Sequence, residues 1–60
     1  MQTAVGFIVQ NGQEKIVVKE SSFSKALRKL KKITKRIEAE RAYAVAYDIH
    51  RNVVREAVVK

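Results

Sequence analysis

Cysteine and proline are absent from the sequence, and glycine occurs only twice in 60 residues. Without cysteine, the chain has no disulfide, no thiolate metal site and no cysteine nucleophile. Without proline, and with so little glycine, it is not a low-complexity linker. No apolar run approaches the roughly 18 residues that a membrane-spanning helix needs, and we identify no secretion signal. We therefore expect one small basic cytoplasmic domain over residues 1–60, without membrane contact.

Residues suited to catalysis are also scarce. The one histidine is His50, and Asp48, two positions earlier, is its nearest partner for an acid–base pair. We interpret both as residues of an exposed turn. Glu38 and Glu40 stand one residue apart at a predicted helix end and are not expected to converge. The sequence therefore predicts no enzyme activity, no cofactor, no metal and no small-molecule substrate.

Positive charge is what the sequence has in excess, with 13 Lys and Arg against 6 Asp and Glu, a formal net charge of +7. The excess comes from residues 25–36, which contain seven cations and no acid. These cations are Lys25, Arg28, Lys29, Lys31, Lys32, Lys35 and Arg36. Like charges three or four positions apart on a helix repel one another. A stretch that tolerates this repulsion indicates an anionic partner.

The same stretch has the spacing of an amphipathic helix. Apolar residues recur every three or four positions: Phe23, Ala26, Leu27, Leu30, Ile33 and Ile37. They fill a sector about 120° wide, and the cations occupy the opposite sector, with Lys31 on its flank. Serines just before Phe23 supply hydroxyls for an N-cap. We predict a helix from about residue 22 to about residue 40.

A β-hairpin is predicted before the helix. Residues 3–10 and 13–20 are rich in strand formers and flank Asn11-Gly12, a strong signal for a two-residue turn. That turn would pair three sets of residues: Val9 with Glu14, Phe7 with Ile16, and Val5 with Val18.

A second hairpin is predicted after the helix, because the apolar period changes from residue 42 onward. Residues 53–59 would form the returning strand. A turn at Arg51-Asn52 would place Asp48 opposite Arg55 as a cross-strand ion pair, whereas a longer turn would change the register. A helix also fits residues 39–47, but alternating Tyr, Val, Tyr and Ile favour a pleated strand.

The predicted fold is α+β, with the order ββαββ and one helix on one face of a four-stranded antiparallel sheet. Ala44, Ala46 and Ala57 suit the face beneath the helix. The other face would carry an apolar patch of a kind that monomers rarely expose. This patch consists of Tyr43, Val45, Tyr47, Ile49, Val54 and Val58. We predict that a second copy covers it in a homodimer.

The basic helix predicts binding to phosphates, because its cations match the charge density of a duplex and arginine can hold a phosphate with two hydrogen bonds. Only Arg28 and Arg36 could address guanine, so we expect contacts to the backbone with little sequence preference. The sequence therefore predicts a small dimeric nucleic-acid-binding protein, chromatin-like or regulatory, with duplex DNA favoured over RNA.

Other interpretations stay open. The basic helix could dock on an acidic protein surface, as in an adaptor or inhibitor, or it could be a solubilising face. Tyr43 and Tyr47 could stack on bases, although we favour a packing role because Val45 and Val58 share their face. A helix on a membrane surface is disfavoured because its apolar residues are needed to cover the sheet. An engineered sequence without function is the last alternative.

Overall fold

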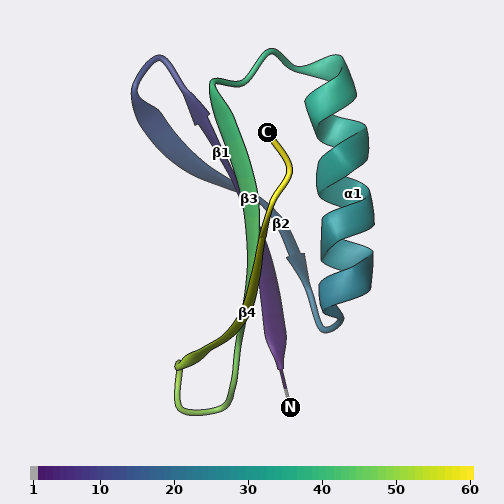
Figure 1. Ribbon diagram of the computed structural model, residues 1–60, viewed down its shortest axis with the longest axis vertical. Coiled ribbons are helices and arrows are strands. Elements are labelled where there is room, and N and C mark those ends of the chain that lie inside the picture. The colour runs from purple at the N-terminus through teal and green to yellow at the C-terminus, as the bar shows by residue number, and fades with distance from the viewer. Residues whose placement is uncertain (1) are drawn as a thin grey trace.

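The computed structural model describes residues 2–60. Its elements are β1 (Thr3–Gln10), β2 (Gln13–Glu20), α1 (Phe23–Arg36), β3 (Arg41–Tyr47) and β4 (Val53–Val58). The strands form one antiparallel sheet in the order β2-β1-β3-β4, and α1 lies along one face of it (Figure 1). The predicted ββαββ arrangement is therefore confirmed, as is the strand interpretation of residues 42–47.

The first hairpin turns at Asn11 and Gly12, whose φ angles are 51° and 74°. A two-residue turn needs positive φ at both positions, which glycine adopts freely and asparagine tolerates. The pairs nearest the turn are those predicted from the sequence: Val9 with Glu14, and Phe7 with Ile16.

Farther from the turn, a shift in register changes which residues face each other. The predicted pair of Val5 and Val18 is wrong, because the register shifts between Gly6 and Phe7. Val18 lies opposite Gly6, and Lys19 lies opposite Val5. One extra residue in a strand turns the following side chains to the other face. Val18 is therefore buried beneath α1, and Lys19 lies on the face away from it.

Helix α1 begins where the sequence predicts. Ser22 is the N-cap: its backbone is extended, and its side chain accepts a bond from the Lys25 backbone N–H, with an N–O distance of 3.5 Å. The helix is amphipathic, with Phe23, Ala26 and Leu30 buried against the sheet. It contains 14 residues, and no helix within residues 2–60 is long and apolar enough to cross a membrane.

The predicted end of the helix near residue 40 is wrong. Ile37 already has an extended backbone and is a partly exposed C-cap rather than a core residue. Two hydrogen bonds hold the following residues against the end of β1. The Gln10 side chain donates to the Glu38 carbonyl at 2.7 Å, and the Glu40 N–H donates to the Val9 carbonyl at 2.8 Å. These bonds draw the chain out of the helix and into β3.

The main core lies between α1 and the face of the sheet that it covers. Leu30 is fully buried there and packs against the alanines of β3 and against Gly6 of β1. A Cβ at Gly6 would lie 3.0 Å from Val18 Cβ and 3.3 Å from Leu30 Cδ1. Glycine and alanine at these positions let the helix approach the sheet closely. The predicted role of Ala44 and Ala46 beneath the helix is thus confirmed.

The second hairpin has a longer turn than predicted. Ala46, rather than Asp48, lies opposite Arg55, so the predicted ion pair between Asp48 and Arg55 is wrong. The side chain of Arg55 lies instead on the covered face, with its guanidinium 4.8 Å from the centre of the Phe23 ring. A cation above an aromatic ring is a favourable contact that links β4 to the start of α1.

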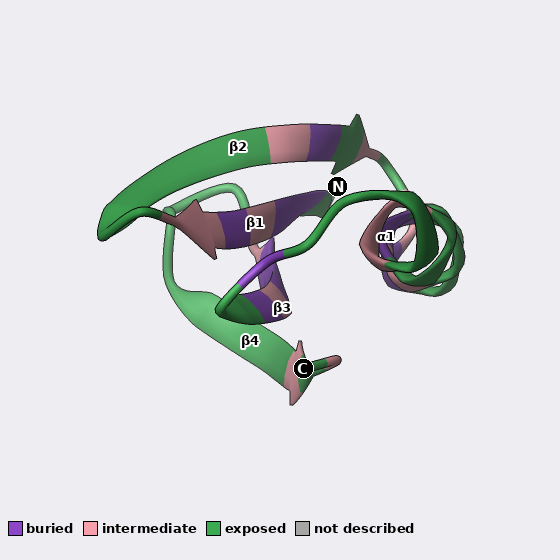
Figure 2. Ribbon diagram, turned by 90° about the horizontal axis from the view of Figure 1, so that it is seen from above, coloured by how far each residue is buried: buried purple, intermediate pink, exposed green. Residues whose placement is uncertain are grey.

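We call the face away from α1 the open face, because no element within residues 2–60 covers it (Figure 2). On this face, the rings of Phe7 and Tyr43 partly shield the neighbouring side chains from solvent. Phe7 and Tyr43 stack with centroids 5.0 Å apart, and Val5 and Val45 are buried beside them. The predicted patch changes at its margin. The register shift places Val53 rather than Val54 opposite Tyr47, and Ile49 lies in the turn beyond β3.

Candidate nucleic-acid interface

Helix α1 presents all seven predicted phosphate-binding side chains at exposed positions. They are Lys25, Arg28, Lys29, Lys31, Lys32, Lys35 and Arg36, and we call them the basic face. Burial of the apolar side of the helix against the sheet fixes their direction, because residues on the opposite side of a helix point to solvent.

Helix stability explains part of this charge but not all of it. The last turn contains Lys35 and Arg36, and cations near the C-terminus interact favourably with the helix dipole. The first turn contains no acid, and Lys25 and Arg28 lie near the positive end of the dipole. Cations there are unfavourable for the isolated helix, so their presence favours a role outside the helix.

One acid reaches the basic face from β2. Glu20 forms an ion pair with Lys29, and its side chain is largely covered while that of Lys29 stays mostly exposed. The hydrogen bond and charge of Lys29, with a smaller contribution from the charge of Lys25, hold the pKa of Glu20 below its ordinary value. Sequence analysis missed this pair, because Glu20 precedes Lys29 by nine residues and lies in a different element.

The side chain of Glu20 lies among several cations of the basic face. A shallow hollow of about 410 Å³ is lined by Glu20 and four cations: Lys25, Arg28, Lys29 and Lys32. A carboxylate thus already lies among groups that would contact a phosphate. Across the chain from Gln2 to Lys60, the ion pair with Lys29 is the only one, so the other six cations of the basic face have no acidic partner.

The length of the basic face suits a polyanion. Lys25 and Arg36 are eleven positions apart, which corresponds to about 16 Å along the helix axis. A DNA duplex presents about ten phosphate charges over that distance. The helix contains no Asn or Gln, the side chains that most often read adenine. The geometry therefore suits contacts to the backbone better than contacts to base edges.

The two tyrosines lie on the face of the sheet opposite the basic helix. Tyr43 and Tyr47 belong to the open face, on the far side of the sheet from α1. Tyr43 is occupied by stacking on Phe7. Base stacking on these rings and phosphate binding by α1 would need two separate strands of nucleic acid. The packing interpretation of the tyrosines is therefore the better one.

The turn that contains His50 is held by Asp48. The carboxylate of Asp48 accepts bonds from the backbone N–H groups of His50, at 2.8 Å, and Asn52, at 2.9 Å. The bond from the Asn52 N–H is the main reason why the pKa of Asp48 is lowered. Oδ1 accepts both of these bonds, and Oδ2 accepts a longer one from the Asn52 side-chain amide, at 3.5 Å, so the geometry gives Asp48 a structural role. In the part of the chain described, no three His, Cys, Asp or Glu side chains gather as for a metal.

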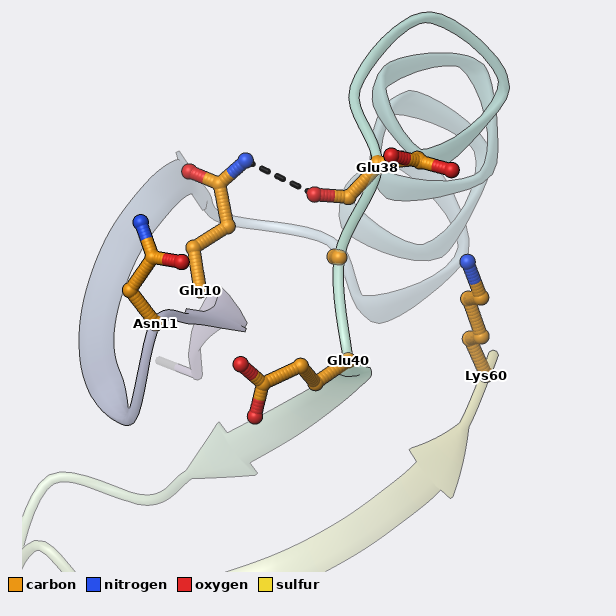
Figure 3. Close-up of a pocket in the computed structure, with 6 residues that line it drawn as sticks. Gln10, Asn11, Glu38, Glu40 and Lys60 are labelled. Carbon is orange, nitrogen blue, oxygen red and sulfur yellow. Dashed lines mark hydrogen bonds between the residues drawn. The ribbon is translucent and has the colours of Figure 1, made fainter.

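A separate polar hollow lies between the end of β1, residues 38–40 just before β3, and Lys60 (Figure 3). Gln10 crosses it to reach the Glu38 carbonyl. The side chains of Glu38 and Glu40 point to opposite sides of the segment that carries them. Two carboxylates arranged in this way do not act on one substrate.

Comparisons with protein-family models, with curated proteins and with solved structures find no match for this chain. Its function is therefore inferred from the chemistry and geometry of the basic face.

Proposed function

We propose that the protein binds nucleic acid through the basic face of α1, mainly through the phosphate backbone, and that it favours duplex DNA over RNA. The observation that supports this most directly is the exposure of seven cations on one helix that have, within residues 2–60, a single acidic partner, Glu20. Release of the counterions condensed on DNA favours such contacts. Because base-reading side chains are few, the affinity depends little on sequence.

The decisive experiment is a binding titration at several salt concentrations with duplex DNA, duplex RNA and single strands. If about six phosphate contacts form, the logarithm of affinity falls with the logarithm of salt with a slope near −5 on duplex DNA, and near −4 on single strands. Affinity that is absent at low salt, or that does not change with salt, would contradict the proposal.

Charge reversal shows whether α1 itself makes the contacts. Lys29→Glu together with Lys32→Glu should abolish retention of DNA. The matched control is Lys15→Glu together with Lys60→Glu, which changes the net charge equally but outside α1. If both pairs weaken binding equally, the effect comes from net charge and the proposed interface is wrong.

A second candidate is an adaptor that docks the basic face on an acidic protein surface. The ion pair between Lys29 and Glu20 favours it, because it shows that the face accepts a carboxylate from another element. An adaptor would show little affinity for any nucleic acid near physiological salt. The titration above therefore separates the two candidates.

A further inference from the structure

Strand pairing arranges the side chains of the open face in rows that cross all four strands. The middle row is entirely apolar and consists of Ile16, Phe7, Tyr43 and Val58. The next row consists of Lys19, Val5, Val45 and Glu56. It has an apolar centre, with a cation on edge strand β2 and an acid on edge strand β4. The register shift in the first hairpin is what brings Lys19 to this face.

The two edge charges do not pair within one chain. Lys19 and Glu56 are separated by three strand spacings, or about 14 Å, and neither forms an ion pair within the described chain. The middle row, beside these charges, leaves apolar surface uncovered at both edges of the sheet, since Ile16 is 63% and Val58 is 72% exposed. A partner for this face therefore needs apolar groups beside an acid that meets Lys19 and a cation that meets Glu56.

A second copy of the chain meets these needs in one orientation. A twofold axis parallel to the strands, running between β1 and β3, places β2 over the partner's β4. Lys19 then faces the partner's Glu56, and symmetry repeats this pair. In the middle row, Ile16 meets the partner's Val58, and Phe7 meets the partner's Tyr43. In these two rows, every apolar position thus faces an apolar position.

An axis perpendicular to the strands matches the face less well. Through the row of Val5 and Val45, it places Lys19 on the partner's Lys19 and Glu56 on the partner's Glu56. Through the middle row, it pairs Lys19 with the partner's Glu14 but leaves Tyr47 uncovered. Like charges across an interface disfavour an orientation, and complementary charges fix it.

We propose that two copies stack through their open faces about an axis parallel to the strands, and that the dimer bridges two separate nucleic-acid segments. In this arrangement the two α1 helices lie on opposite outer surfaces. With sheets about 10 Å apart and helices about 10 Å thick, the two basic faces are on the order of 30 Å apart. They point away from each other, so they reach two duplexes rather than one. The bridging part rests on the proposed binding to nucleic acid, and the stacking does not.

The stacking is tested by measuring mass by light scattering at micromolar concentration. The intact chain should have twice the monomer mass. Lys19→Glu and Glu56→Lys should each weaken the dimer at least tenfold, because each replaces two attractive pairs by two repulsive ones. An equimolar mixture of the two variants should restore the dimer, because every charge in the mixed dimer then meets its opposite. Restoration also shows that both variants are folded.

Lys15→Glu is the matched control. It lies on the same strand and makes the same change in charge, but its side chain is paired with Ile8 on the covered face. It should leave the dimer intact. A monomeric intact chain overturns the stacking, as does a mixture that stays monomeric. Rescue of Lys19→Glu by Glu14→Lys, and not by Glu56→Lys, assigns the perpendicular axis and overturns the proposed one.

Bridging is tested with one duplex immobilised on beads and a second, labelled duplex in solution. The intact protein and Lys15→Glu should capture the labelled duplex. Lys19→Glu should bind the immobilised duplex yet capture at least tenfold less of the labelled one, and mixing with Glu56→Lys should restore capture. Binding without capture by an intact dimer overturns the bridging alone. Absence of all DNA binding overturns the proposed function, whereas the mass measurement still decides the stacking.

Discussion

The two faces of the sheet are built from side chains of different size, and this difference decides which face receives the helix. The covered face has Gly6 and the alanines of β3, so a helix can lie close enough to bury Leu30 completely. The open face has rings and valines, which shield one another partly and leave the rest exposed. Small residues thus create a site for a second layer within the chain, and large ones create a surface suited to another molecule.

The largest expected effect comes from the covered face. Leu30→Ala should lower the free energy of unfolding by about 2–5 kcal/mol, because it removes a fully buried side chain and leaves a cavity. Denaturant unfolding measures it. Val45→Ala on the open face should cost less in dilute solution, and its cost should grow with protein concentration if the faces stack. If Leu30→Ala and Val45→Ala lower the free energy of unfolding equally at every protein concentration, the two faces do not differ in the way described.

Gly6→Ala tests how closely the helix must approach the sheet. A Cβ at this position would lie 3.0 Å from Val18 Cβ, so we expect a loss of about 1–3 kcal/mol from overpacking. Thermal unfolding measures it. The double variant Gly6→Ala with Val18→Ala should recover part of the loss, because the closest neighbour is then smaller. A neutral Gly6→Ala would show that the layers separate easily.

Ser22→Ala tests the local signal that begins the helix. Loss of the side-chain bond to the Lys25 N–H should cost about 1 kcal/mol. Ser24→Ala, two residues later and exposed, is the control and should cost less. If the two variants unfold alike, packing against the sheet fixes the start of the helix without help from its cap.

The smallest effect is expected from Glu20 and depends on pH. Its pKa is lower in the folded chain than its ordinary value of 4.5. The pair with Lys29 therefore contributes its full stability above that value and loses it as the pH falls toward the folded pKa. Unfolding measured between neutral and acidic pH should show a shallower decline in Glu20→Gln than in the intact chain. An identical decline would mean that the pair has no effect on folding.

Local patterns accounted for much of the fold. The Asn11-Gly12 turn and its nearest pairs were predictable because the backbone of a two-residue turn is set by its own residues. The register beyond Phe7 was not predictable, because the consecutive residues Ile16, Val17 and Val18 are all apolar and fit either face. The end of the helix was missed because no Gly or Pro marks it, and contacts with β1 decide it.

The residues of the candidate site can likewise be separated into those that the sequence predicted and those that only the structure revealed. The cations of the basic face were predictable because helical spacing alone separates them from the apolar residues. Glu20 was missed because alternation in a strand does not show which part of a helix lies above it. A two-residue turn at Arg51-Asn52 predicts that Arg55 pairs with Asp48, whereas the longer turn of the structure brings Arg55 to Phe23.

The two hairpins, the amphipathic helix and the separation of its charged and apolar sides follow from local sequence patterns, because each depends on residues only a few positions apart. The contact of Glu20 with Lys29, and the position of Lys19 and Glu56 at opposite edges of one row, depend instead on how the whole sheet packs. Side chains in a strand alternate between its two faces with a period of two residues. A single shift in register reverses the direction of every side chain after it, and only the packing of the whole sheet sets where that shift occurs.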